Sequence, residues 1–124
     1  MPAPKMSAKL IPLPKLLKKA QDTFNAWVRR RDKDKGCISC GNEGNQAGHY
    51  LSQGHHSKMR FNEVNTNLQC TRCNMFLHGN LINYRQGLVK KHGERKVLWL
   101  ESEGKGVKKW SRAELMAIIS EYSK

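Results

Sequence analysis

The chain has 124 residues, of which 23 are Lys or Arg and 10 are Asp or Glu, so its formal net charge is +13. A hydrophobic content of 38% predicts one domain with a thin core, and no run approaches the roughly 20 apolar residues that a membrane span needs. We therefore expect no membrane association and a polyanionic partner, for which DNA is the first candidate. A merely basic, well-solvated surface is the alternative.

The N-terminal part predicts an arm followed by a helix. Residues 1–12 are rich in proline, so we expect a loose arm there and a single domain over residues 13–124. The start lacks the continuous apolar stretch and the cleavage site of a secretory signal, so the expected compartment is the cytoplasm. From residue 13 onward, apolar side chains recur at three- and four-residue steps, which is typical of a helix that buries one face.

The opposite face of this predicted helix is basic. It is either a solvated surface or a surface that contacts DNA phosphates. The candidates for phosphate contact are Lys18, Lys19, Arg29, Arg30 and Arg31.

The four cysteines form two C-x-x-C pairs, Cys37 with Cys40 and Cys70 with Cys73. Each pair offers two thiolates about one tight turn apart, which suits a tetrahedral, structural Zn²⁺ site. Disulfides are the alternative, but a reducing cytoplasm disfavours them. The stretch between the pairs is longer than the roughly 15 to 20 residues of a simple zinc ribbon, so we expect it to carry functional residues.

The stretch from the first cysteine pair toward the second predicts short strands and a loop. Residues 37–50 predict the first zinc knuckle and a hairpin. Residues 51–63 show no periodicity and predict a loop rich in cations. Two of these, His55 and His56, are expected to contact DNA or solvent rather than a metal.

Helices are predicted after the second pair. Apolar spacing predicts a helix that ends at Gly93, although Gly79 and Asn80 also allow two short helices. The zinc-bound core would then span about residues 36–92, with C-terminal helices over 94–124. A capping box of the form S-x-x-E predicts where the last of these helices begins.

A knuckle, a Gly-His strand, a loop, an Asn and a second knuckle that runs into a helix resemble, in this order, the ββα-metal (HNH) nuclease module. His49 matches the first histidine of that module, and Asn65 matches its asparagine. Asn74 stands where the module usually has histidine, and it resembles the Mg²⁺-binding asparagine in the HNH domain of CRISPR effector nucleases. His78 follows four residues later, and on a continuous helix it would share a face with Asn74.

A narrower resemblance covers most of the chain. The blocks FNAWVRRRDKDKGCISCG, AGHY, RFNEVN, QCTRCN and GNLINYRQGL are similar in order and spacing to the NinG/Rap family of phage recombination endonucleases. The resemblance implies an α+β fold with a zinc-stapled ββα-metal core flanked by N- and C-terminal helices. It also implies action on branched recombination intermediates, such as Holliday junctions and displacement loops, in the cytoplasm of the host cell. A homodimer is the candidate assembly.

The chemistry of phosphodiester cleavage suggests roles for these residues. His49 is the expected general base, because an imidazole titrates near neutrality. Asn74 and His78 are expected to bind the catalytic Mg²⁺ or Mn²⁺. Asn65 is expected to hydrogen-bond across the turn or to the backbone of His49, and so to orient the base.

Two further points concern the phosphate and the metal ligands. Arg60 and Arg85 are candidates to clamp the phosphate, since a guanidinium pairs bidentately with its oxygens. Gly48 stands where most HNH nucleases place a metal-binding Asp, although the phage family also reads Gly-His there. Another oxygen must complete the metal shell, and Glu63, Asp32 and water are the candidates.

These observations predict a metal-dependent DNA endonuclease. A relaxed or nicking HNH nuclease would share every catalytic residue and would differ in what it binds. A non-catalytic zinc-finger DNA-binding protein would share the cysteines and the charge, but it would not need His49 in register with Asn65 and Asn74. For His78, an exposed histidine without a function is the alternative.

Overall fold

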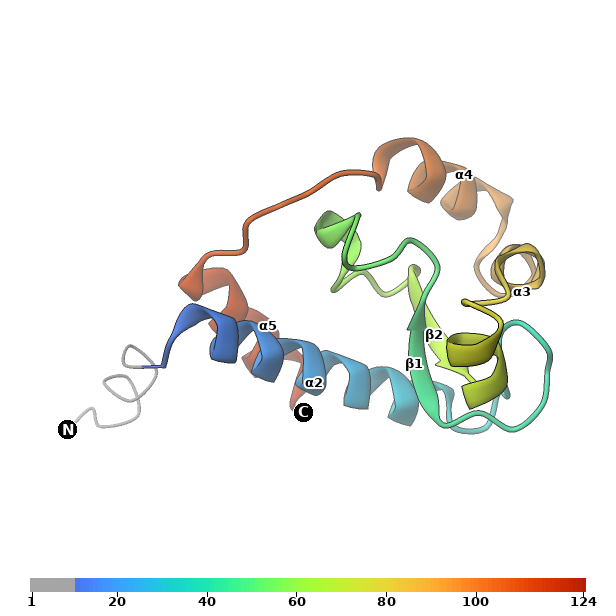
Figure 1. The fold of residues 1–124 in the computed structure, drawn as a ribbon, viewed down its shortest axis with the longest axis horizontal. Helices are drawn as coiled ribbons and strands as arrows, with labels where there is room; N and C mark the ends of the chain where they lie inside the picture. The colour runs from blue at the N-terminus through green and yellow to red at the C-terminus, as the bar shows by residue number, and fades with distance from the viewer. Residues whose placement is uncertain (1–10) are drawn as a thin grey trace.

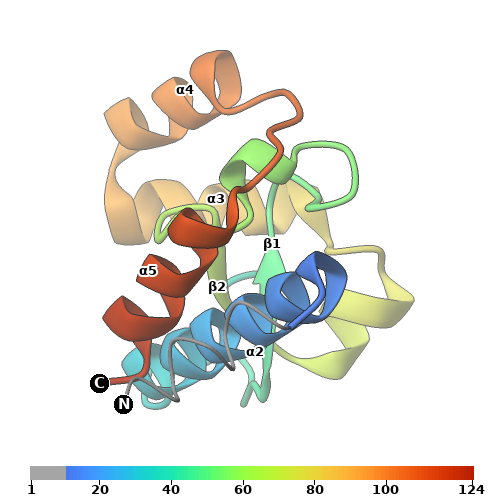
Figure 2. The same ribbon diagram turned by 90° about the vertical axis from the view of Figure 1, so that its left-hand side faces the viewer.

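The structure, a computed structural model, describes residues 11–124 and is an α+β fold, as expected (Figure 1). Two helices pack on one side of a small antiparallel sheet, and two more pair beyond its other side (Figures 1 and 2). The predicted loose arm falls mostly outside the described residues. Within residues 11–124, no helix is long and apolar enough to cross a membrane.

Helix α2 (Leu13–Asp32) confirms the N-terminal helix prediction. Pro14 lies in its first turn, where the missing backbone N–H would have no helical partner in any case. Its apolar face packs against α5 (Arg112–Tyr122) and against both strands. The buried residues of this first cluster are Leu16, Ala20, Phe24, Val28, Phe61 and Leu115.

The C-terminal helix α5 begins where the sequence predicts. Ser111 Oγ accepts from the backbone N–H of Glu114 (3.2 Å), and Glu114 Oε1 accepts from the backbone N–H of Ser111 (2.9 Å). These two bonds form the reciprocal capping box. The preceding helix, α4 (Glu94–Glu103), was also predicted from the sequence, and a segment from Gly104 to Ser111 connects the two helices.

The sheet consists of β1 (Gln46–His49) and β2 (Thr66–Gln69), which pair in antiparallel fashion with Gly48 opposite Asn67. The predicted hairpin within residues 37–50 is therefore wrong, because β1 pairs with a strand that lies beyond the loop. The loop itself is irregular, as expected, apart from a 3₁₀ turn, η1 (Ser57–Met59). Strand pairing thus brings the second cysteine pair close to the first.

Helix α3 (Leu81–His92) and α4 enclose a second apolar cluster with the loop that follows β1. Tyr84 is completely buried there, and its hydroxyl lies 2.7 Å from the carbonyl oxygen of Gly48. The other buried members of this cluster are Met59, Leu88, Val97 and Leu100. Tyr84 therefore ties α3 directly to the strand that carries His49.

The region after Cys73 is not one helix. A single π-helical turn, η2 (Arg72–Phe76), is closed by the backbone N–H of Leu77, which donates to Arg72 O (2.9 Å). His78 and Asn80 then adopt left-handed conformations with φ of 50° and 46°, and α3 starts only after them. The structure thus corresponds to the predicted alternative of two short helical segments.

Candidate metal and catalytic site

The four cysteines converge on one point. Their sulfur atoms all lie within 4.8 Å of one another, and Cys40 Sγ is 3.8 Å from Cys70 Sγ. Four sulfurs around Zn²⁺ at about 2.3 Å would stand about 3.8 Å apart, so this cluster can hold a metal ion such as zinc. The separation is far too long for a disulfide, and all four thiols are free.

The local backbone prepares these sulfurs for a metal. The backbone N–H of Gly41 donates to Cys37 O (2.8 Å), which closes the first knuckle as a tight turn. In the second knuckle the backbone N–H of Cys73 donates to Cys70 Sγ (3.4 Å), and this bond, together with contacts to the other three thiols, lowers the pKa of the Cys70 thiol to about 7. Asn80 Nδ2 lies 3.5 Å from Cys73 Sγ. N–H donors of this kind stabilise thiolate, which is the form that binds metal.

His49 is held at the end of β1 by the loop that follows it. Its Nε2 lies 3.1 Å from the carbonyl oxygen of Arg60. A carbonyl can only accept, so Nε2 carries the proton and Nδ1 is left as the basic nitrogen. Burial lowers the pKa of His49 below its usual value of 6.5, so the ring is neutral at pH 7 and able to accept a proton.

Asn65 is completely buried and closes the loop between the strands. Its Oδ1 accepts from the backbone N–H of Leu51 (2.7 Å), and its Nδ2 donates to Leu51 O (3.0 Å) and to Met59 O (3.3 Å). The backbone N–H of Tyr50 also donates to Asn65 O (2.9 Å). Because this loop presents the Arg60 carbonyl to His49, Asn65 acts on the histidine through the loop and not by direct contact.

Asn74 lies in η2 and reaches back over β1. Its Nδ2 donates to Gln46 Oε1 (2.8 Å), and its Oδ1 lies 3.0 Å from the place where a Cβ on residue 48 would be. Asn74 therefore lies over β1 at the residue that precedes His49. The shared helix face with His78 is wrong, because η2 ends at Phe76 and His78 stands exposed in a left-handed turn.

The two arginines predicted to clamp phosphate have different surroundings. Arg60 is half-buried, its Nε donates to Gln21 Oε1 (2.9 Å), and its guanidinium lies over the ring of Phe61. Arg85 is paired bidentately with Glu101, with Nε–Oε2 at 2.8 Å and Nη2–Oε1 at 3.0 Å. This pairing uses the donors that a phosphate would need, so the predicted role of Arg85 has no support.

The basic face of α2 is exposed at Lys18, Lys19, Arg29 and Arg30, although Lys18 pairs with Asp22 (2.7 Å). Arg31 is not part of this face, so its predicted phosphate contact has no support. Its guanidinium turns inward. It pairs with Asp32 and donates to carbonyl oxygens of the loop and of β2, those of Glu63 and Thr66.

His55 and His56 lie in the loop, as expected, and neither belongs to a metal-ligand cluster within the described chain. His55 is exposed, and its Nδ1 lies 3.1 Å from Ser52 Oγ. His56 Nδ1 accepts from the backbone N–H of Gly106 (3.1 Å) and so docks the loop on the segment before α5. Of the two, only His55 presents its ring to solvent.

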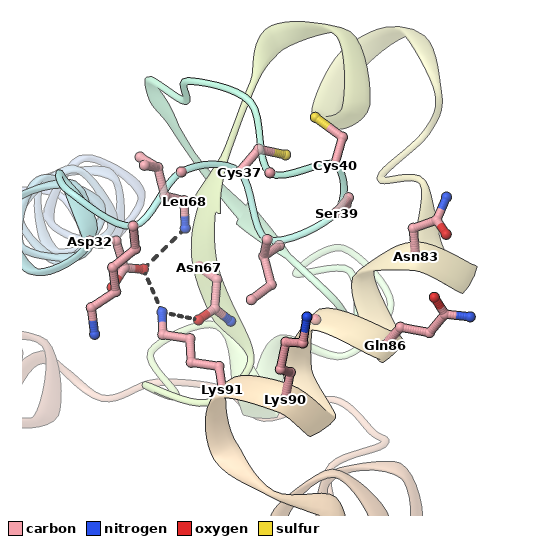
Figure 3. Close-up of a pocket in the computed structure, with 15 residues that line it drawn as sticks. Asp32, Cys37, Ser39, Cys40, Asn67, Leu68, Asn83, Gln86, Lys90 and Lys91 are labelled. Carbon is pink, nitrogen blue, oxygen red and sulfur yellow. Dashed lines mark hydrogen bonds and ion pairs between the residues drawn. The ribbon is translucent and has the colours of Figure 1, made fainter.

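A cavity of about 610 Å³ lies beside the first knuckle (Figure 3). Asp32 lies in its wall and accepts from Lys91 Nζ (2.9 Å), and the same nitrogen donates to Asn67 Oδ1 (2.7 Å). The predicted catalytic residues all lie in the described part of the chain, and none of them lines this cavity. The cavity therefore marks an ion-pair network between α2, β2 and α3, and not the catalytic site.

Two residues near the candidate site were missed by the sequence analysis. Tyr84 fixes the carbonyl of Gly48, and Gln69 lies against the α-carbon of Gly48. Tyr84 belongs to the apolar spacing that predicted a helix ending at Gly93, but this spacing assigned it no further role. Gln69 gave no local signal, because its position depends on the pairing of two distant strands.

A family model described as Bacteriophage Lambda NinG protein matches residues 4–124. Protein ninG of Escherichia phage lambda is 39% identical over 109 residues, which cover 86% of this chain and 53% of that protein. Protein ninG of Salmonella phage P22 gives the same values, and protein ninG of Escherichia phage 933W is 38% identical. The chain thus spans about half the length of the curated relatives it matches. No solved structure matches it.

Proposed function

This chain belongs to the NinG family of bacteriophage proteins, and from that premise we propose that it is a metal-dependent DNA endonuclease with a ββα-metal core. One observation carries the proposal. Strand β1 ends in a neutral, oriented histidine, His49, and the amide oxygen of Asn74 lies over the preceding residue, while Asn74 itself stands in η2 beside a cysteine cluster that can hold zinc. A protein that only binds DNA would not need this arrangement.

His49 serves as the general base in this proposal. Nδ1 is available to take a proton from the attacking water, because Nε2 is occupied by the Arg60 carbonyl. Asn65 acts as a positioning residue, since it holds the loop that carries that carbonyl. The low pKa of His49 keeps the ring in its base form at neutral pH.

A divalent cation, Mg²⁺ or Mn²⁺, would neutralise charge on the phosphate and on the departing 3′-oxygen. Asn74 is the residue we propose to bind it through Oδ1, which is turned toward β1 by the bond from its amide nitrogen to Gln46. His78 is left out of this set, because the argument for it depended on a continuous helix. The cysteines would hold a structural zinc that fixes η2, and hence Asn74, relative to β1.

The proposed substrate is branched DNA of the kind that arises in recombination. The net charge of +13 supports a DNA substrate. Branching rests on the resemblance to recombination endonucleases. Symmetric cutting of a junction would require two active sites, and hence a homodimer. A relaxed or nicking HNH nuclease is the alternative, and the substrates in the following experiment distinguish the two.

The test is cleavage of labelled linear duplex, single strand and four-way junction in the presence of Mg²⁺, Mn²⁺ or chelator. The parent should cut the junction preferentially and only with metal. His49→Ala should lower the rate by roughly 10² to 10⁴, the usual contribution of a general base, with unchanged zinc content and DNA affinity. His92→Ala, which removes an imidazole at the end of α3, is the matched control and should keep activity. A His49→Ala protein that cuts normally would make the module a DNA-binding zinc finger.

The pH profile supplies a second readout of the same experiment. Because the base form is active and burial lowers the pKa of His49, the rate should hold near neutrality and fall only as the pH drops below 6.5. The residual activity of His49→Ala should lack this acid limb. An acid limb that survives the substitution would assign the base to another group.

A further inference from the structure

The amide of Gln69 occupies the space where a side chain on residue 48 would be. A Cβ on Gly48 would collide with Gln69 Oε1 and would lie 3.0 Å from Asn74 Oδ1. The strand register explains this approach. Gly48 pairs with Asn67, so Gln69 is its diagonal neighbour on the same face of the sheet. Two amide oxygens therefore face one small space at Gly48.

The orientation of the Gln69 amide is fixed by its partners. Nε2 donates to the carbonyl oxygen of Gly79 (2.8 Å) and to Ser39 Oγ (2.9 Å). Since a carbonyl accepts and never donates, the amide nitrogen must face Gly79 and the oxygen must point the other way. The amide of Asn74 is held by Gln46, whose Oε1 accepts from Asn74 Nδ2 and whose Nε2 donates to Thr71 Oγ1. Both side chains that carry these oxygens are therefore hydrogen-bonded and not free to rotate.

Gln69 Oε1 has no hydrogen-bond partner among the described residues, although Gln69 is completely buried. Buried polar atoms nearly always pair with protein, water or an ion. The two carboxylates considered as metal ligands from the sequence are used elsewhere. Asp32 is held between Arg31 and Lys91, and Glu63 accepts from the hydroxyl of Tyr122. The buried side-chain oxygens without a partner among the described residues are Thr66 Oγ1 and Gln69 Oε1, and Gln69 Oε1 is the one that lies where a Cβ on residue 48 would stand.

We propose that Gln69 replaces the metal-binding Asp that most HNH nucleases place at position 48, and that Gln69 Oε1 and Asn74 Oδ1 bind the divalent cation together. The proposal rests on the proposed nuclease function for the identity of the ligand class, a hard divalent cation. Amide oxygens suit such an ion. Gly48 is then required for a steric reason, because any Cβ there would displace the Gln69 oxygen.

The experiment measures Mn²⁺ binding to the zinc-loaded protein by electron paramagnetic resonance, without DNA and without cleavage. Loss of supporting residues usually weakens metal sites by 10- to 100-fold, so Gln69→Ala should raise the Kd for Mn²⁺ at least about tenfold. The double variant Gly48→Asp with Gln69→Ala places a carboxylate in the vacated space and should restore binding. Its matched control, Gly48→Ala with Gln69→Ala, fills the space without an oxygen and should not restore it.

Several outcomes would overturn the inference. They are a parent that binds no Mn²⁺, a Gln69→Ala protein with unchanged affinity, and two double variants that behave alike. In any of these cases the Gln69 oxygen would be satisfied by a buried water and would have a structural role only. If Gln69→Ala loses its zinc or unfolds, Gln69→Glu replaces it in the test. The near-isosteric carboxylate should lower the Kd, and an unchanged or higher Kd counts against the proposal.

The readout separates this inference from the function on which it rests. A protein that binds Mn²⁺ through Gln69 but cuts no DNA would contradict the nuclease proposal and leave the metal site standing. A protein that cuts DNA with the same Mn²⁺ requirement after Gln69→Ala would contradict the role of Gln69 in the metal site and leave the nuclease proposal standing.

Discussion

The layer formed by α2 and α5 and the region that carries the cysteines are held together by different interactions. In the helical layer, the ring centroids of Phe24, which is buried, and Tyr122 are 4.7 Å apart. Beside the two helices, the rings of Phe61 and Trp110 meet edge-on with their centroids 4.9 Å apart. In the cysteine region, β2 is buried along its whole length, yet Leu68 is its only apolar residue. The amide nitrogens of Asn67 and Gln69 on this strand donate hydrogen bonds instead.

This difference shows how a small chain can support a polar site. Apolar packing stabilises the helical layer without fixing the direction of any donor or acceptor. Buried polar side chains such as Asn65 and Asn67 need specific partners, and meeting that need fixes their geometry. They contribute little hydrophobic stabilisation, so we expect the metal to supply the stability that the thin core does not.

Removal of zinc should give the largest effect and should separate the two regions. Zinc contributes about 10–16 kcal/mol to the folding of small zinc-finger peptides, so chelation or Cys73→Ser should abolish hydrogen-exchange protection over residues 37–80. Amides in α2 and α5 should keep part of their protection, because their contacts are apolar. Mass spectrometry of exchange checks this. Zinc added back should restore the protection of the chelated parent but not that of Cys73→Ser. An equal loss of hydrogen-exchange protection in both regions would show that the two regions do not depend on zinc differently.

A cavity in the helical layer should give the converse result. Phe24→Ala should reduce the free energy of unfolding by about 3–5 kcal/mol, because it empties the centre of the aromatic cluster. Zinc stoichiometry should remain that of the parent, since no ligand is touched. Phe76→Ala is the control, because that ring is 72% exposed and its loss should change stability by less than about 0.5 kcal/mol. Denaturant titration with zinc present measures both. Loss of zinc from Phe24→Ala would show that the regions do not differ as described.

Asp32 joins the two regions, and its removal should have an intermediate effect. Burial alone would raise the pKa of this carboxyl, but hydrogen bonds from Arg31 and Lys91 outweigh it and hold the pKa at about 2. The lowered pKa contributes about 2 kcal/mol that is fully present above the usual value of 3.8 and is lost as the pH falls toward 2. Asp32→Asn should therefore reduce stability at pH 7 by about that amount.

The difference between Asp32→Asn and the parent should narrow with falling pH. Asp22→Asn provides the control, since this exposed carboxylate pairs with Lys18 on the same helix and should contribute no more than about 1 kcal/mol. Equal effects of the two substitutions at pH 7 would mean that the buried network does not hold the regions together.

The sequence was informative wherever structure depends on neighbours in the chain. Apolar spacing predicted α2, and the capping residues predicted the start of α5. The pairing of β1 with β2 joins residues that are far apart in the chain, so nothing local revealed it, and a local hairpin was predicted instead. After Cys73 the predicted alternative of two short helical segments is observed, because the left-handed residues His78 and Asn80 separate η2 from α3.

The same distinction applies to the candidate site. Cysteine spacing predicted the metal cluster, because each C-x-x-C pair is a local turn. Gln69 could not be predicted as a partner of Gly48 without the strand register. The inward orientation of Arg31 was equally hidden, because its partners lie on β2 and on the loop before it.

The basic face of α2 gives the smallest expected effect and tests whether the helical layer contributes to function at all. Replacing Lys18, Lys19, Arg29 and Arg30 by Gln should weaken DNA binding and reduce the slope of log K against log salt by about one per lost phosphate contact. Control variants should remove the same charge elsewhere, by Gln at the exposed residues Arg95, Lys96, Lys105 and Lys109. If both sets reduce the slope equally, net charge alone attracts DNA. If only the α2 set does, the helix lies on the DNA. An unchanged slope for the α2 set would leave α2 and α5 as scaffold alone, and DNA contact would then lie within the cysteine region.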